Sequence, residues 1–298
     1  MQSSFLDEIR NFFTRGSILA RLIGINLAIF VLVSFIRVIF FLTDAPSAYD
    51  SIIHWFGVPS NPETLLARPW TLISYMFLHF DIFHIFFNML ILYIGGRLFR
   101  DFLGEDRLTG TYIIGGLIGA LFFILSYNFF PVFQQIKAVS VAIGASAAVL
   151  AIFVAVATYM PNYQLPLIIL GRIRLKYIAI FFVVLDLISI DKGNSGGHLA
   201  HLGGALWGFT YISLLKKGKD PGRWLGVWIN ALGSIFKPKP KMRVEYKSER
   251  PVTDEEYNKR RANQQKRMDE ILDKISKHGY DSLSKEEKEI LFKLSNKD

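Results

Sequence analysis

Ser146 and His201 are the residues of this sequence best suited to nucleophilic chemistry. Ser146 begins an apolar segment that runs to about Met160. At the start of a helix the backbone N–H groups lack intrahelical acceptors, so an oxyanion forming beside Ser146 would find donors in place. A serine hydroxyl needs a base within hydrogen-bond reach, and the neutral imidazole of His201 suits that role near neutral pH. The pair predicts hydrolysis of an ester or amide through an acyl-enzyme.

Other polar residues in apolar segments could assist this chemistry. His84 and Asn88 are spaced i, i+4 and share one helix face, where both can donate hydrogen bonds to a negative oxygen. Ionisable groups inside a membrane are costly and indicate function. A transporter of metal or protons is the alternative interpretation, in which a divalent ion would bind His79, His84, His198 and His201, but no Glu or Cys accompanies them. We expect no metal and no cofactor.

Asp186 is an acidic residue inside an apolar segment, far from His201 in sequence. We expect it to cap or pack against a neighbouring helix. The sequence therefore predicts a Ser–His dyad rather than a triad.

Composition and charge indicate a membrane-embedded body followed by a polar, basic extension. The chain has 298 residues, of which 51% are hydrophobic, and 26 are Phe. Residues 216–298 hold 21 of the 34 Lys and Arg residues. The basic residues flank apolar segments, which argues against nucleic acid as a partner. Because there is no Cys, disulfides and thiolate metal sites are excluded.

The apolar segments that must position these residues predict an all-α, polytopic membrane protein with a bundle of six transmembrane helices. The expected spans are 19–42, 78–99, 108–127, 145–160, 175–190 and 198–215, several of them short for a bilayer. Basic residues gather in the loops of one side, so the positive-inside rule places both termini in the cytoplasm and Ser146 toward the outer face. No cleavable signal peptide is expected.

Small residues predict how the serine and histidine segments meet. Taken alone, the small residues around Ser146 favour helix packing over catalysis, because they let transmembrane helices approach closely. Gly204 and Gly208 form a GxxxG step in the last span, and its natural neighbour is the small face of 144–148. That contact would bring His201 to Ser146.

Three motifs in order resemble the rhomboid family of intramembrane serine proteases over residues 17–216. They are the helix from His79 through His84 to Asn88 after Arg68-Pro69-Trp70, then Gly144-Ala145-Ser146-Ala147, then Ala200-His201-Leu202-Gly203-Gly204. The resemblance is to the bacterial six-span type of this family. It implies Ser146 as nucleophile and His201 as base. It implies an oxyanion hole made by His84, Asn88 and the Ser146 amide. Gly144, His79 and Gly204 would have supporting roles.

The family resemblance also implies partners and a location. Substrates would be transmembrane proteins in the lipid bilayer, cut in or near the membrane where helix-weakening residues free the backbone. The expected location is the bacterial inner membrane. Leu150 stands where many members have Tyr, and Ala147 where they often have Gly, so support for His201 must come from another residue. A pseudoenzyme is the other interpretation, but such relatives lose the serine or the histidine.

Outside the protease domain at 17–216, three further segments are expected. Residues 1–16 suit a cytoplasmic or interfacial segment, and 217–246 an amphipathic and basic segment at anionic head groups. Residues 247–298 suit a soluble helical hairpin, whose partner the sequence does not identify. Thr253 with Glu256 and Ser284 with Glu287 fit capping boxes, and Gly279 fits a helix terminator.

Overall fold

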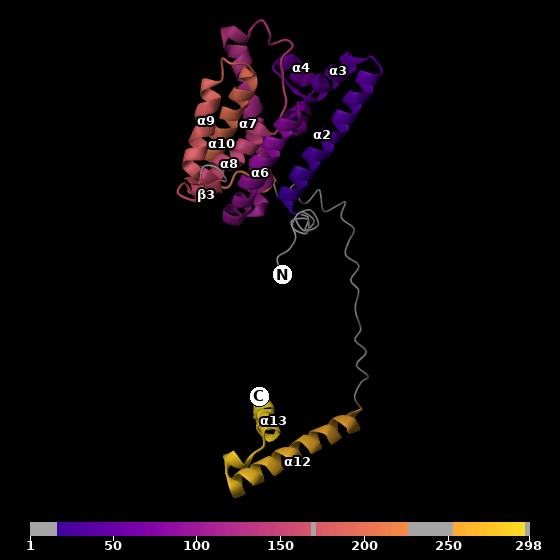
Figure 1. Cartoon of the computed structure of the whole chain (residues 1–298), viewed down its shortest axis with the longest axis vertical. Coiled ribbons are helices and arrows are strands. Elements are labelled where there is room, and N and C mark those ends of the chain that lie inside the picture. The colour runs from indigo at the N-terminus through magenta and orange to yellow at the C-terminus, as the bar shows by residue number, and fades with distance from the viewer. Residues whose placement is uncertain (1–16, 168–170, 226–252, 296–298) are drawn as a thin grey trace. The chain divides into compact units, whose positions relative to one another are not determined.

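A computed structural model describes residues 17–167, 171–225 and 253–295 (Figure 1). The chain divides into two units, Met1–Lys237 and Pro238–Asp298. The expected interfacial segment at 1–16 and most of the amphipathic and basic segment at 217–246 lie outside the described residues. Each unit is described by itself below.

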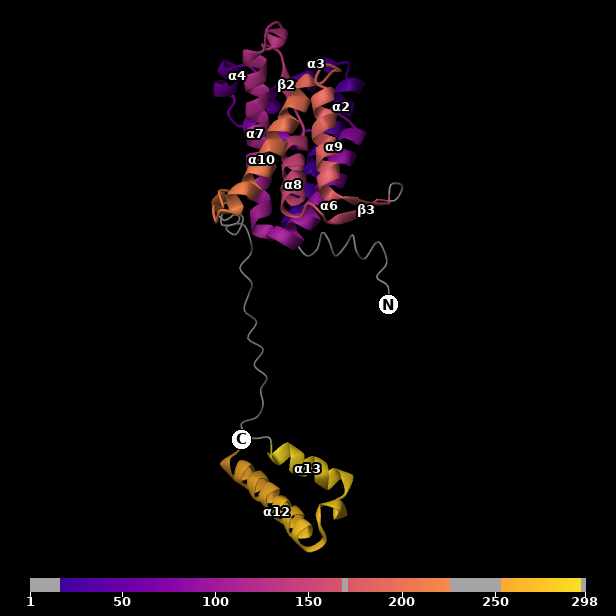
Figure 2. The same cartoon turned by 90° about the vertical axis from the view of Figure 1, so that its left-hand side faces the viewer.

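The first unit is a bundle of helices that run side by side (Figures 1 and 2). The long helices are α2 (Ile18–Leu42), α6 (Ile82–Leu103), α7 (Leu108–Phe129), α8 (Ser146–Tyr159), α9 (Leu175–Ile188) and α10 (Ser195–Leu215). Each overlaps one of the six expected spans. The connection after α2 contains α3 (Pro46–Phe56), α4 (Pro62–Ala67), α5 (Thr71–Ser74) and the 3-10 turn Tyr75–Phe77, and two further turns are Glu105–Arg107 and Pro131–Phe133.

The helices differ in how well they suit a membrane span. Among the described residues, Ile18–Leu42, Ile82–Leu103 and Glu105–Phe129 are long and apolar enough to cross a bilayer, and Ser146–Tyr159 is a shorter apolar helix. The described helices thus include three of the six expected spans on these criteria, so the count of six stays a prediction. Apolar side chains on the outside of the bundle, such as Phe35 and Phe181, suit contact with lipid.

Helix α8 occupies the centre of the bundle. Its residues from Ala147 through Ala157 are all buried, and it packs against α10, α7 and α6. Small residues make this packing close: a Cβ at Gly204 would lie 2.0 Å from the Ala147 carbonyl oxygen, and one at Gly208 would lie 2.3 Å from that of Ala151. The α8–α10 contact expected from the GxxxG step is therefore present, and it allows no larger side chain.

The expectation of an all-α fold is wrong in one detail, because two short antiparallel strand pairs are present. Strand β1 (Val58–Pro59) pairs with β2 (Val141–Ala142), joining the loops before α4 and α8. Strand β3 (Gln164–Leu167) pairs with β4 (Gly171–Arg174) in a hairpin between α8 and α9. Such short strands carry too little alternation to be read from sequence. The fold is mostly helical.

The second unit contains α12 (Asp254–His278), the 3-10 turn Tyr280–Ser282 and α13 (Lys285–Ser295). Its predicted caps are present. The Thr253 hydroxyl accepts from the Glu256 amide, and Gly279, at φ 78°, ends α12. At α13 the Ser284 and Glu287 side chains each accept from the other residue's amide, which is a complete capping box. Ile271 and Leu283 are its buried apolar residues.

Candidate active site

Ser146 is the first residue of α8, and a short loop fixes its position. The β1–β2 pair holds the loop, and the Gly144 amide donates to the Tyr75 carbonyl oxygen at 2.9 Å. Gly144 has φ 133°, a conformation that side-chain-bearing residues rarely adopt. A Cβ there would lie 3.0 Å from His84 Nε2 and 3.4 Å from Ser146 Oγ. Glycine therefore allows both the turn and the approach of His84 to the serine.

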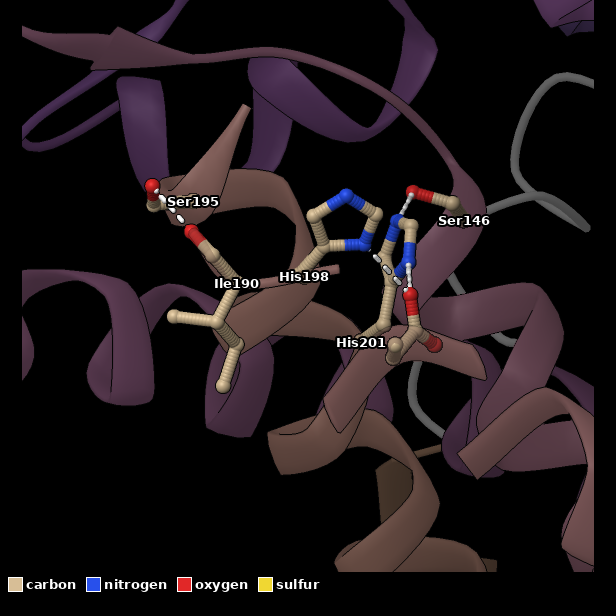
Figure 3. A network of polar contacts seen from close by, with 6 residues as sticks. Ser146, Ile190, Ser195, His198 and His201 are labelled. Atoms are coloured by element: carbon tan, nitrogen blue, oxygen red, sulfur yellow. Dashed lines mark hydrogen bonds and ion pairs between the residues drawn. The ribbon is translucent and has the colours of Figure 1, made fainter. Parts of the chain in front are cut away.

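His201 and Asp186 complete a line of hydrogen bonds from Ser146. His201 Nε2 lies 2.6 Å from Ser146 Oγ, and His201 Nδ1 lies 2.8 Å from Asp186 Oδ1 (Figure 3). With Nδ1–H donating to the carboxylate, the neutral ring presents its Nε2 lone pair to the serine hydroxyl. This tautomer is the one that a general base requires.

The expectation that Asp186 only caps or packs against a neighbouring helix is wrong, because its carboxylate contacts His201. The reaction by a dyad stays a prediction. The side chain is buried, and its Oδ1 also lies 2.8 Å from His198 Nδ1. His198 and His201 are one turn apart on α10. Both rings therefore reach the same carboxylate oxygen of Asp186, which lies on α9. The sequence marked Asp186 as unusual, because an acid inside an apolar segment carries the same cost that singled out the histidines, but it did not identify His201 as the partner.

The turn from α9 to α10 sets the position of the two histidines. Asn194 has φ 48°, and the Ser195 hydroxyl donates to the Ile190 carbonyl oxygen at 2.5 Å (Figure 3). These features close the turn at the first residue of α10. The register of His198 and His201 toward Asp186 follows from that start.

His84 and Asn88 lie on α6 beside the serine, and both line the same cavity. Asp81 caps this helix, because its Oδ1 accepts from the amides of Phe83 and His84 at 2.8 and 2.9 Å. The Phe80 amide donates to His84 Nδ1 at 3.3 Å. The neutral His84 ring therefore carries its proton on Nε2, as a donor near Ser146. Asn88 Nδ2 donates to the His84 carbonyl oxygen at 2.8 Å and keeps a second N–H.

The other predicted supporting residues lie behind the site. His79 is 3% exposed, and its ring meets that of His84 edge-on with centroids 5.1 Å apart. Gly204 provides the close approach of α10 to α8 described above. Both residues support the positions of the polar groups and do not line the cavity.

A cavity of about 850 Å³ opens above the serine. Ser146, His201 and Asp186 form part of its lining together with the two polar residues of α6. Apart from Asp81 and Asn194, the remaining wall is mostly apolar and includes Phe83, Phe87 and Ile91 of α6, Phe182 and Leu185 of α9, and Leu150 of α8. The arrangement can hold an apolar chain with a carbonyl group against the polar residues.

The metal alternative used four histidines, and the structure separates them into two pairs. His79 and His84 face each other, whereas His198 and His201 meet at Asp186. The ligand atoms of Asp186, His198 and His201 lie within 4.8 Å of one another, the one such group among the described residues. Both histidines already hydrogen-bond to Asp186 through their Nδ1 atoms, and His201 also faces Ser146. The contacts fit proton transfer better than an ion-transport path.

Comparisons with known proteins agree with the predicted family. A model of the rhomboid domain matches residues 66–218, and a family of unknown function (DUF6576) matches residues 253–297. The presenilin-associated rhomboid-like protein, mitochondrial, of Rattus norvegicus is 29% identical over 201 residues, covering 61% of this chain and 48% of that protein. RHOMBOID-like protein 12, mitochondrial, of Arabidopsis thaliana is 30% identical over 162 residues, covering 51% and 48%.

The relatives bear on the predicted location, and the domain match shows the family. The chain spans about half the length of the curated relatives it matches. The names of these relatives place them in mitochondria, so the comparisons do not support the expected bacterial inner membrane. They do support a multi-pass membrane protein. The rhomboid match covers more than half of the sequence and contains every residue of the site described above. The chain belongs to the rhomboid family.

Proposed function

We propose that this chain is an intramembrane serine endopeptidase that cleaves transmembrane proteins in or near their membrane segments. The observation that carries the proposal is the 2.6 Å contact between Ser146 Oγ and His201 Nε2 inside a cavity with apolar walls. A serine and a base at this distance are the requirement for an acyl-enzyme mechanism. The rhomboid family, whose members are typically serine proteases, supports the same activity.

In the proposed reaction His201 takes the Ser146 proton as Oγ bonds to the scissile carbonyl carbon. The buried Asp186 carboxylate stabilises the imidazolium that forms, so the charge arises beside a partner already in position. His201 then protonates the departing amine, and the C–N bond breaks to leave an ester on Ser146. Water, deprotonated by His201, attacks the ester and releases the carboxyl product while the proton returns to Oγ.

The oxyanion formed in both steps requires donors. His84 Nε2–H, the second Asn88 N–H and the Ser146 amide are the proposed set, because all three belong to residues that line the cavity beside the hydroxyl. Hydrogen bonds fix both side chains before substrate arrives, through Phe80 and the α6 backbone. Such preorganised donors stabilise charge without reorganisation during the reaction.

The substrate class follows from the cavity walls between α6 and α9. Apolar side chains suit a segment taken from the bilayer, and a peptide carbonyl can reach Ser146 only if its own helical hydrogen bond is broken. We therefore expect Gly, Pro or other helix-weakening residues near the cleaved bond. The proposed topology has six spans, with both termini on the side of Arg97, Arg100 and Arg107.

The test combines covalent labelling with cleavage. Wild-type protein, Ser146→Ala and His201→Ala are treated with a fluorescent fluorophosphonate and incubated with a single-span model substrate. We expect labelling and cleavage in wild type only, with activity falling on the order of 10⁴-fold or more in Ser146→Ala. Thermal unfolding checks that each variant is folded. Cleavage at the wild-type rate by folded Ser146→Ala would disprove the assignment.

A further inference from the structure

The β3–β4 hairpin between α8 and α9 has two chemically distinct faces. The strand register pairs Leu165 with Ile173 and Leu167 with Gly171, and it pairs Gln164 with Arg174 and Pro166 with Arg172. Residues two apart in a strand share a face, so the first two pairs form an apolar face and the other two a basic face. The burial pattern agrees, because Leu165, Leu167 and Ile173 are partly buried while Arg172 and Arg174 are exposed.

The hairpin lies at one end of the bundle and extends sideways. Figure 2 shows β3 running outward from the foot of α8 and α6, crosswise to the long helices. Leu165 packs against the core, and Phe102 near the end of α6 meets Tyr163, just before β3, with ring centroids 5.4 Å apart. A hairpin that extends sideways from the ends of membrane helices lies at the level of the lipid head groups. An apolar face and a basic face are the expected pattern for that position.

The arginines of the basic face have no acidic partner among the residues that the structure describes. No described ion pair includes Arg172 or Arg174. The sequence contains no Asp or Glu between Arg107 and Asp186. Acids at the neighbouring helix ends are engaged elsewhere, Asp101 with Arg100 and Asp220 with Arg107. The two guanidinium groups therefore face solvent with their charge uncompensated.

Helix α9 continues directly from the hairpin and offers an apolar surface beside it. Lys176 adds a third cation within five residues, with its ammonium over the Tyr177 ring at 5.2 Å. Above it, Ile180, Phe181 and Val184 are among the exposed apolar side chains of α9. Cations at the head-group level and an apolar helix face next to them match the two halves of a phospholipid.

We propose that Arg172 and Arg174 bind the head group of an anionic phospholipid, whose acyl chains lie along the exposed face of α9. Guanidinium groups bind phosphate through paired N–H donors, and anionic head groups supply the charge that the protein lacks here. This site is separate from the residues of the proposed reaction and does not depend on it. It gives α9 an external contact at its first turn.

The experiment measures lipid binding to the full chain by native mass spectrometry. Purified protein is titrated with phosphatidylglycerol or with phosphatidylcholine of the same acyl chains. Wild type should bind phosphatidylglycerol more tightly, and Arg172→Gln/Arg174→Gln should weaken that binding about 25-fold, since each surface cation contributes about fivefold. Phosphatidylcholine binding should not change. The preference should also decrease as salt is raised.

A matched control removes two positive charges from loops at the other end of the helices. Lys137→Gln/Lys192→Gln should keep the phosphatidylglycerol affinity within about twofold of wild type, and thermal unfolding should find both double variants folded. An equal loss of phosphatidylglycerol affinity in the two double variants would mean that net charge alone explains the binding. That result would overturn the proposed site. Unchanged affinity in Arg172→Gln/Arg174→Gln, or no preference for phosphatidylglycerol in wild type, would also overturn it.

Discussion

Helices α8 and α9 each supply one member of the hydrogen-bonded line at the candidate site, yet the bundle holds them very differently. Every residue of α8 from Ala147 to Ala157 is buried, whereas α9 buries only Leu175, Ala179 and Asp186. The helix that begins at Ser146 is therefore fixed by packing on all sides. Asp186 is on a helix with one side packed against the core, partly through Phe182 against Phe153, and with the hydrogen bonds of Asp186 itself.

This difference in packing indicates that α8 holds a fixed position, whereas α9 can adjust its position. Close packing makes α8 costly to shift, because protein interiors have little free volume. Helix α9 faces the cavity with Phe182 and Leu185 and faces outward with Phe181 and Ile180. The hydrogen bonds of Asp186 to His198 and His201 therefore contribute more to fixing α9 than single polar contacts contribute to fixing α8. Variants in the two helices should show this contrast.

The largest effect is expected from Asp186→Asn. The amide keeps the shape of the carboxylate but loses its charge, so it can neither stabilise the imidazolium nor impose the Nδ1–H tautomer of His201. We expect kcat to fall by about 10² to 10⁴-fold, with fluorophosphonate labelling slowed in parallel. A kcat within about threefold of wild type would restore the dyad and reduce Asp186 to a packing residue.

A smaller effect is expected on stability, where the packed surface of α8 can be compared with the exposed face of α9. The surface of α8 is tested from Gly204, which contacts it from α10. Gly204→Val places a side chain against the Ala147 carbonyl oxygen, where even a Cβ would lie 2.0 Å away. We expect the free energy of unfolding to fall by about 1–3 kcal/mol or more. Phe181→Ala, on the exposed face of α9, should change it by less than about 0.5 kcal/mol in detergent. Equal losses, measured by thermal unfolding, would contradict the contrast between the two helices.

The smallest effect is expected in the second unit, whose helices depend on exposed polar contacts. The pKa of Glu287 is lowered because its carboxylate accepts from the Ser284 amide and also faces the Lys274 ammonium. A lowered folded-state pKa contributes stability above the ordinary pKa, and this contribution is lost as pH falls through the folded value. The helix content of the second unit should therefore decrease slightly below about pH 4, and less in Glu287→Gln than in wild type. A larger acid loss in the variant would contradict this assignment.

The sequence predicted much of this molecule because its strongest signals are local. Apolar runs predicted the long helices, and the small residues at Gly204 and Gly208 predicted which helices pack closely. The tail caps followed from Thr253, Ser284 and Gly279. Two features did not follow. The β1–β2 pair joins segments far apart in the chain, and the β3–β4 strands are too short to show alternation. The contact of Asp186 with His201 depends on how α9 turns back into α10, which no local pattern encodes.

The length of α8 has a consequence for access to Ser146. With 14 residues against 22 in α6, it extends about 21 Å where its neighbour extends about 33 Å, and the hydrocarbon layer is about 30 Å thick. Because neighbouring helices enclose α8, this difference in length leaves Ser146 at the bottom of a depression and not level with the surrounding helix ends. A polypeptide must pass those helix ends before it meets the hydroxyl.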